Sequence, residues 1–156
     1  MTYYPPVSFQ FEVRVADGES DSNKADGSFS EVTGMRAEMQ FEEVSGGGEN
    51  GVVYKLPQHV KHGSLVLKRG LVLSDSKLSE WVNQVLMMGF DEGVPLKNLV
   101  VSLLKTNPEN NVLEPNKSWV FQDAYPVKVE LSDLNANNNE VLVESIEVVY
   151  KQMFLI

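Results

Sequence analysis

Three groups of residues in this chain are of types that could do chemistry. The three consecutive glycines at 46–48 could cradle a phosphate, because backbone N–H groups can approach an anion closely there. His59 and His62 have an H-x-x-H spacing that could bind a metal ion. Glu42 and Glu43 are neighbouring carboxylates, and pairs of carboxylates share a proton in acid–base catalysis. Whether any of this chemistry is possible depends on the segment that carries each group.

The glycine triplet does not have the surroundings of a phosphate loop. No Gly-Lys-Ser/Thr follows it, and the next segment has a strand pattern rather than that of a helix whose N-terminus could hold phosphate. Glu42, Glu43 and Glu49 would repel an anion. The strand patterns on both sides predict a hairpin connection instead. The sequence leaves open whether it is a plain loop or an arm that contacts a partner.

The histidines and the carboxylates do not predict a site either. His59 and His62 lie between the predicted strands, beside Pro57 and with no carboxylate nearby in the sequence, so we expect two surface histidines and no metal. Side chains alternate faces along a strand, so Glu42 and Glu43 point to opposite sides and cannot share a proton. The chain has no cysteine and no serine in a G-x-S-x-G elbow. We therefore expect no catalytic residues and no cofactor.

The length and composition predict a single domain that spans residues 1–156. Hydrophobic residues make up 42% of the chain, which is enough for a core, and the net charge of −9 disfavours nucleic acids and anionic membranes as partners. An acidic surface can also line a passage to which anionic cargo must not adhere. The N-terminus lacks the basic and apolar regions of a secretory signal, and no apolar run reaches the roughly 20 residues of a membrane anchor.

Alternating apolar and polar residues predict strands along most of the chain. The expected strands are 7–15, 35–41, 52–56, 64–72, 96–105, 118–122, 125–131 and 140–154. Pro57 is expected to end the third of them, because proline has no backbone N–H to donate. A polar loop without periodicity is expected at 16–28.

One segment changes to the period of a helix. Its apolar stripe consists of Leu78, Trp81, Val82, Val85 and Leu86. Ser74, Asp75 or Ser76 can cap the start of this helix, and Gly89 suits the residue after its end. About eight strands and one helix predict a mainly β fold, in which the helix packs on a small barrel or sandwich.

The order of these segments resembles the tail tube protein family of contractile phages and related bacterial contractile injection systems. The residues that carry the resemblance are FSEVTGM at 29–35, LKRGL at 67–71 with the helix around Trp81, and AYPVKVELSDLNANNNEV at 124–141. The resemblance implies a small β-barrel of two packed antiparallel sheets with one α-helix, similar to the type VI secretion tube protein. Two segments, YYPPVSFQF and EEVSGGGENGVVYKLP, look more like the smaller tube-like proteins that start the tube at the baseplate.

The resemblance implies a structural role without catalysis. Six copies would form a ring, and rings would stack into a tube inside a contractile sheath, with baseplate and spike proteins as further partners. The expected location is the bacterial cytoplasm during assembly, and then a phage tail or an extracellular or cell-associated injection particle. Neither a specific nucleic acid nor a stable membrane anchor is expected. The loop at 16–28 is an insertion relative to the leanest tube subunits, and it must clear the neighbouring ring, the sheath or the lumen.

The resemblance also implies which residues meet a neighbour. In the tube family the loop at the glycine triplet reaches toward an adjacent subunit, where glycine lets the backbone take a positive φ and lie close to another chain. The residues implied at this subunit interface are Glu43, Ser45, Gly46, Gly47, Gly48, Glu49, Asn50 and Gly51. Alternation places Glu38, Gln40 and Glu42 on one polar face. Such a face is usually a solvated strand face, and the alternative is the lining of a lumen or an interface. For a tube subunit we hypothesise that it contributes to the lining of the lumen.

Two other functions are compatible with the sequence. A small-molecule-binding β-barrel of the lipocalin type would need a ligand-sized apolar cavity, whereas ring assembly buries loops and strand edges between subunits. A hydrolase would need a nucleophile with its base, and the sequence has no such motif. Whether the interior of the barrel holds a ligand-sized cavity therefore distinguishes a small-molecule-binding protein from an assembly protein.

Overall fold

A computed structural model describes residues 10–16, 28–48, 51–70, 76–87, 89, 93–132 and 142–156. Several features that we expected from the sequence lie outside these residues. They are the start of the first strand at 7–9, most of the polar loop at 16–28, the possible cap residues Ser74 and Asp75, and the predicted interface residues Glu49 and Asn50.

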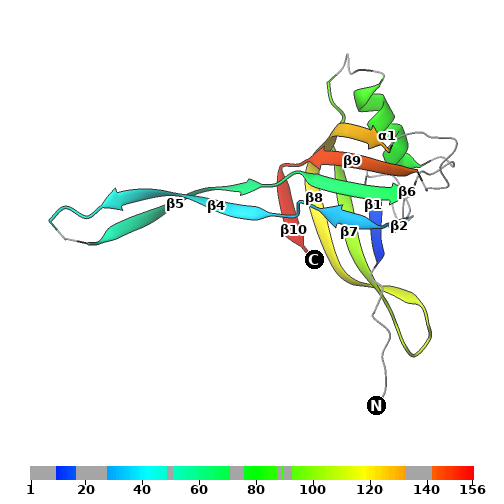
Figure 1. Ribbon diagram of the computed structural model, residues 1–156, viewed down its shortest axis with the longest axis horizontal. Coiled ribbons are helices and arrows are strands. Elements are labelled where there is room, and N and C mark those ends of the chain that lie inside the picture. Colours follow the sequence, from blue (N-terminus) through cyan, green and yellow to red (C-terminus); the bar gives the residue numbers. More distant parts are fainter. Residues whose placement is uncertain are drawn as a thin grey trace.

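The described residues form ten strands and one helix, and their order confirms the predicted mainly β fold with a single helix (Figure 1). The elements are β1 (Gln10–Ala16), β2 (Ser28–Phe29), β3 (Glu31–Thr33), β4 (Ala37–Ser45), β5 (Val53–His62), β6 (Leu65–Gly70), α1 (Lys77–Leu86), β7 (Lys97–Thr106), β8 (Leu113–Leu131), β9 (Val143–Val149) and β10 (Gln152–Leu155).

Eight of the strands form one curled antiparallel sheet. Its order is β2-β1-β7-β8-β9-β6-β3, with β10 paired to β8 off this path. The long strand β8 belongs to both halves of the sheet, because its first part pairs with β7 and β10 and its last part pairs with β9. Only Ser30 separates β2 from β3, so this bent stretch joins β1 to β6. The sheet thus curls into the expected barrel-like body of two packed halves.

Apolar side chains from both halves of the sheet fill the space between them. Fully buried core residues are Val13, Leu65, Leu67, Leu99, Val101, Phe121, Ala124, Ile146 and Val148. Along β6 and β9 buried and partly exposed residues alternate, which is the pattern of a strand with one face in the core. Because these side chains occupy the interior, the barrel is a packed core rather than a ligand container.

The helix α1 covers one end of this body and has the predicted apolar stripe. Leu78, Trp81, Val82 and Val85 are its buried residues, and the Trp81 indole N–H donates to the Pro95 carbonyl oxygen at 2.8 Å. Ser76 is the N-cap, because its hydroxyl accepts a hydrogen bond from the Ser79 backbone N–H at 3.1 Å. The helix is short, so Gly89 lies three residues beyond its end. Among the described residues, no helix is long and apolar enough to cross a bilayer.

Several strand boundaries differ from the prediction, and one of them concerns Pro57. We expected Pro57 to end its strand, but β5 continues through it to His62. Pro57 lies opposite Phe41 at a position whose backbone N–H would point away from β4. No ladder hydrogen bond is therefore lost, and proline is tolerated on such an outer edge.

Two further differences involve β8 and the last strand. The predicted strands 118–122 and 125–131 are one continuous strand, which turns at Asp123, where φ is 52°. The predicted strand 140–154 is instead two strands, β9 and β10, separated at Tyr150 and Lys151. The break occurs where the chain leaves the last part of β8 and begins to pair with its first part.

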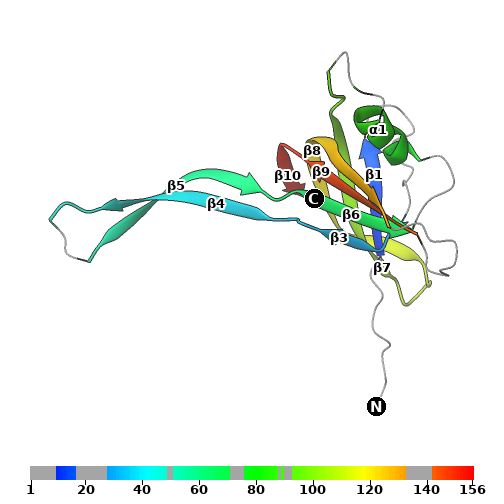
Figure 2. The same ribbon diagram turned by 45° about the horizontal axis from the view of Figure 1, so that its top comes forward.

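Strands β4 and β5 do not join the curled sheet. They pair only with each other and form a two-stranded ribbon that projects far from the body, with the glycine turn at its end (Figures 1 and 2). We call this ribbon, residues 37–62, the arm. The hairpin connection predicted at the glycine triplet is thereby confirmed.

Candidate assembly interface

The arm leaves the body through a root that only glycine can form. Gly34 has a φ of 85°, and a Cβ at this position would run into the Ser64 carbonyl oxygen. On the returning strand, the Gly63 backbone N–H donates to the Arg36 carbonyl oxygen at 3.0 Å, and a Cβ on Gly63 would lie 2.8 Å from the Gly34 carbonyl oxygen. The two chain segments therefore approach too closely for a side chain, which fixes the direction of the arm.

Aromatic side chains pack the root against the body. The His62 ring lies 5.4 Å from the Tyr150 ring, and the Tyr150 ring meets the buried Phe121 edge-on at 4.8 Å. Our expectation that the two histidines lie between strands is wrong, because both belong to β5. His59 is exposed, as we expected, whereas His62 ends the strand and is half-buried. The Nδ1 atom of His62 and the hydroxyl of Tyr150 are buried and have no hydrogen-bond partner among the described residues.

Burial also affects the acidity of Tyr150. Desolvation raises the pKa of its hydroxyl above the usual value, because the phenolate would lose its hydration there. The positive charge of Arg36 has the opposite but smaller effect on this pKa. Tyr150 therefore stays a neutral packing group at the root of the arm.

Beyond its root, the arm exposes large apolar side chains. The side chains that are 49–54% exposed are Met39, Phe41, Val53, Tyr54 and Leu56. An isolated two-stranded ribbon is marginally stable in water, and a soluble monomer rarely exposes so much contiguous apolar surface. The arm thus has the composition of a surface that is buried against another molecule.

The apolar residues change faces along the arm. Near the root, Met39 and its cross-strand partner Val60 lie on the same face as Phe41. Near the tip, the apolar pair Val44 and Tyr54 lies on the opposite face, next to Leu56. The two strands cross midway along the arm in both views, so the ribbon has turned over there (Figures 1 and 2). Val53, opposite Ser45, lies on the Phe41 face near the tip, so both faces of the arm carry exposed apolar residues.

Glu38, Gln40 and Glu42 share the other face of β4 near the root, as their alternation predicts. Glu38 lies opposite Lys61, and Glu42 lies opposite Leu56. Glu38 and Glu42 are exposed, and Gln40 is partly exposed. This polar face belongs to the arm and not to the curled sheet, so it faces a lumen only if the arm does.

The predicted interface residues cluster at the tip of the arm. Ser45 pairs with Val53, and Glu43 pairs with Lys55. Gly48 and Gly51 have φ values of 85° and 87°, so the turn needs glycine at these two positions. A Cβ added at Gly47, Gly48 or Gly51 would meet nothing within 4 Å, because the turn touches no other part of the described chain.

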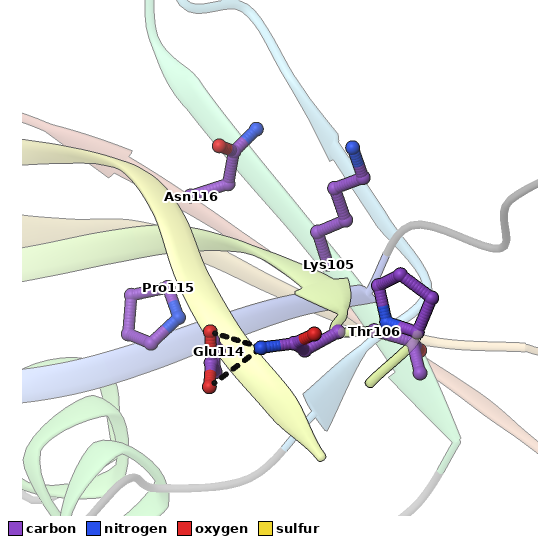
Figure 3. A pocket seen from close by; sticks show the side chains of 7 residues that line it. Lys105, Thr106, Glu114, Pro115 and Asn116 are labelled. Atoms are coloured by element: carbon purple, nitrogen blue, oxygen red, sulfur yellow. Dashed lines mark hydrogen bonds between the residues drawn. The ribbon is translucent and has the colours of Figure 1, made fainter. Parts of the chain in front are cut away.

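Sequence reasoning missed a second projecting surface, the hairpin between β7 and β8. Its tip exposes Val112 and Leu113, and Asn111 takes a φ of 56° there. A pocket of about 200 Å³ lies at its base, where the carboxylate of Glu114 accepts two hydrogen bonds of 3.3 Å from the Asn107 amide (Figure 3). The turn-rich residues at 106–116 signal a loop but not how far the strands beside it extend.

A larger pocket of about 390 Å³ lies outside the barrel, between α1 and the ends of β8 and β9. Val82, Met87, Val129 and Leu131 supply its apolar wall. Among the described residues, no group of three or more histidine, aspartate or glutamate side chains could hold a metal ion. The arm is therefore the feature with the clearest functional signal.

The chain thus combines a packed barrel with a long arm that exposes apolar side chains. Residues 7–154 match the family of the T4-like virus tail tube protein gp19. Because this match covers almost the whole chain, the protein belongs to that tail tube family, as the resemblance of its segments indicated. No curated protein sequence matches the chain.

Solved structures of contractile injection systems have the same fold. A chain in the six-fold symmetrised anti-feeding prophage baseplate is 27% identical, with a TM-score of 0.71 over 100% of this chain and 97% of that one. A chain in the sheath/tube terminator of the PVC extracellular contractile injection system is 21% identical, with a TM-score of 0.71 and coverage of 100% and 99%. An Hcp protein is 12% identical, with a TM-score of 0.61 and coverage of 94% and 91%.

Proposed function

We propose that the protein is a subunit of the inner tube of a contractile tail or injection system, assembles as hexameric rings that stack into a conduit, and lies at the baseplate end. The observation that carries this proposal is the arm, whose large apolar side chains are 40–54% exposed in the single chain. The similar chain in a six-fold symmetrised baseplate supports both the ring symmetry and the position.

The shape of the subunit suits a ring. The arm and the body are different surfaces of one molecule, so an arm that binds the body of a neighbour makes a head-to-tail contact. Repeated by rotation, such a contact closes into a ring, and the β7–β8 hairpin projects in a different direction and is available for stacking (Figure 1). The glycine turn at 46–48, with Glu43, Ser45 and residues 49–51, then contacts the adjacent subunit.

The charge of the chain suits a conduit. A net charge of −9 per subunit gives a ring an acidic surface that anionic cargo does not adhere to. Glu38, Gln40 and Glu42 contribute to the lumen in this proposal. Its further partners are the sheath and the baseplate and spike proteins, first in the bacterial cytoplasm and then in the phage tail or injection particle. The role is structural and involves no catalysis.

The oligomeric state tests the proposal directly. We expect rings or short tubes by negative-stain electron microscopy, and by native mass spectrometry a species of six times the 17.4 kDa chain. If the pure chain stays monomeric, its baseplate partners should template the ring. A chain that is monomeric at high concentration and also inert toward those partners would refute the proposal.

Arm variants identify the surface responsible. Phe41→Ser with Leu56→Ser should abolish ring formation without changing the melting temperature, because both side chains are about half exposed in the subunit. Met87→Ser is the matched control, since it removes an exposed apolar side chain outside the arm. Replacement of Gly46, Gly47 and Gly48 by alanine should also impair assembly. If that triple variant assembled normally, the turn would be a plain hairpin loop.

A further inference from the structure

Among the strands of four or more residues that the structure describes, three pair with a single other strand along their whole length, so one edge of each is fully open. Among the described residues, β4 and β5 pair only with each other, and β10 pairs only with β8. An open edge presents a row of backbone N–H and C=O groups to which another strand can add. The arm and β10 therefore offer whole strand edges to which another chain can add.

The register shows which backbone groups the arm offers. The Gly46 N–H donates to the Val52 carbonyl oxygen. Along an antiparallel ladder, residue pairs that are hydrogen-bonded to each other alternate with pairs that are not. Counted from Gly46 and Val52, every second residue pair of the arm is therefore hydrogen-bonded. In β4 the N–H and C=O groups of Phe41, Glu43 and Ser45 consequently point outward. In β5 the outward positions include Pro57, which has no N–H. Proline removes one donor from the β5 edge, whereas the β4 edge keeps all of its donors and is therefore the better acceptor of a strand.

The same reasoning applies to β10. The Ile156 N–H donates to the Ser118 carbonyl oxygen at 2.9 Å, so Phe154 and Gln152 also bond to β8. The backbone groups of Met153 and Leu155 point to the open side. Leu155 is 59% exposed and Phe154 is 44% exposed, so this edge is apolar as well as open.

We propose that the open β4 edge of one copy pairs with the open β10 edge of the next copy. This inference rests on the proposed assembly into rings. The pairing makes the arm an additional part of the neighbour's sheet. The nine residues of β4 span about 30 Å, which is enough to cross a neighbouring subunit. In both views β10 lies beside the root of the arm, so the donor and acceptor edges are separate surfaces of one molecule (Figures 1 and 2).

Charge favours this pairing over the alternatives. β4 carries Glu38, Glu42 and Glu43 and no basic residue, whereas β10 is flanked by the exposed Lys151 and, on β8, by the exposed Lys117. Two antiparallel β4 edges whose register brings residues 42 and 43 together would place glutamates opposite glutamates, which destabilises a strand pair. A symmetric arm-to-arm dimer is thus disfavoured, and the head-to-tail contact that a ring needs is favoured.

Cysteine cross-linking tests the contact cleanly, because the native chain contains no cysteine. Glu43→Cys and Ser45→Cys are each combined with Leu155→Cys and oxidised after assembly. We expect covalent multimers on a denaturing gel for at least one of these pairs. The matched controls combine Leu155→Cys with Lys55→Cys or with Val53→Cys. Lys55 and Val53 lie opposite Glu43 and Ser45, on the β5 edge of the arm. The controls should stay monomeric on the same gel.

A second pair of variants tests the backbone pairing itself. Leu155→Pro removes an N–H that points to the open side, so the subunit should fold normally and ring formation should weaken about tenfold or more. Leu155→Thr keeps the N–H and should assemble far better than the proline variant. Equal assembly of the two variants would overturn the proposed strand pairing.

The outcomes separate this inference from the proposed function. If rings form but cross-links arise only through the β5 controls, or through neither edge, the β4–β10 contact is wrong and the tube function stands. If the chain forms no ring alone or with its partners, the proposed function fails and this contact fails with it.

Discussion

At the scale of the residue, Arg69 shows how the subunit holds its helix. It is 1% exposed although it is charged, and its guanidinium bonds to Glu144 at 3.3 Å and to the hydroxyls of Ser76 and Ser79. Its guanidinium carbon also lies 4.8 Å from the centre of the Phe29 ring. One side chain of β6 thereby connects β9, the start of α1 and β2.

Removing this charge should be costly. In Arg69→Met the carboxylate of Glu144, itself 8% exposed, stays buried without its partner, which should lower the free energy of unfolding by about 3–5 kcal/mol. Lys68→Met is the neighbouring control, since the Lys68–Glu31 pair at 3.9 Å is exposed and should contribute less than about 1 kcal/mol. Urea denaturation of both variants measures the difference. Equal losses of unfolding free energy in the two variants would show that the buried Arg69–Glu144 pair contributes no more to stability than the exposed Lys68–Glu31 pair.

The hydroxyl of Tyr150 leads to a prediction about pH. It is buried without a partner among the described residues, so Tyr150→Phe should be neutral or slightly stabilising at pH 7, by up to about 1 kcal/mol. Burial raises the pKa of Tyr150, so the folded chain keeps a proton that the unfolded chain releases near pH 10. The stability of the native protein should therefore fall above that pH.

Comparison of the native protein with the Tyr150→Phe variant isolates the effect of the tyrosine hydroxyl on stability. Denaturation at pH 7, 9 and 10.5 should show the advantage of Tyr150→Phe over the native protein increasing only at the highest pH. Every other residue is the same in both proteins, so its contribution cancels in the comparison. Parallel losses of stability would mean that Tyr150 ionises as easily in the folded chain as in the unfolded one.

At the scale of the element, the root of the arm should be far less tolerant than its tip. Gly34→Ala places a Cβ against the Ser64 carbonyl and also strains a backbone φ of 85°, so we expect a loss of more than about 3 kcal/mol. Gly48→Ala has the same φ of 85° but open space around it, so we expect about 1–2 kcal/mol at most. Thermal unfolding of the two variants gives the comparison. Similar melting temperatures would contradict a close-packed root.

Alternation identified most strands because one face of each lies in the core, as in β6 and β9. It failed where pairing, rather than burial, decides where a strand ends. Pro57 continues its strand because its missing N–H faces outward, and the sequence around it does not show which way that is. Likewise, Tyr150 and Lys151 interrupt an apolar alternation only because the chain changes partners along β8.

The candidate site was predictable only in part, because alternation reveals the strands of the arm but not what they pack against. Strand patterns on both sides of Gly46–Gly48 indicate a hairpin, and glycine is required at Gly48. That the hairpin leaves the body is not visible in the sequence, because β4 and β5 alternate as a half-buried pair would. The apolar residues exposed on both faces become informative only once the structure shows that no sheet covers them.

At the scale of the whole molecule, net charge opposes assembly. Two chains of −9 about 40 Å apart would repel each other by about 8 kcal/mol in water without salt. At 0.01 M salt the Debye length is about 30 Å, and roughly 2 kcal/mol of this repulsion remains. At 0.15 M salt the Debye length is about 8 Å, and less than about 0.1 kcal/mol of the repulsion remains. An exposed contact between Lys151 and a glutamate contributes about 0–1 kcal/mol in the opposite direction. The long-range repulsion should therefore prevail at low salt.

Ring formation should accordingly strengthen as salt is added. Between 0.01 M and 0.15 M sodium chloride, the protein concentration at which half of the chains are assembled should fall about tenfold or more, because roughly 2 kcal/mol of repulsion per contact is screened. Analytical ultracentrifugation across a dilution series measures this concentration, and sucrose of equal osmolality should not reproduce the change. Assembly that weakened over the same range of salt would mean that local ion pairs, such as those of Lys151 and Lys117 with β4, outweigh the repulsion between whole subunits.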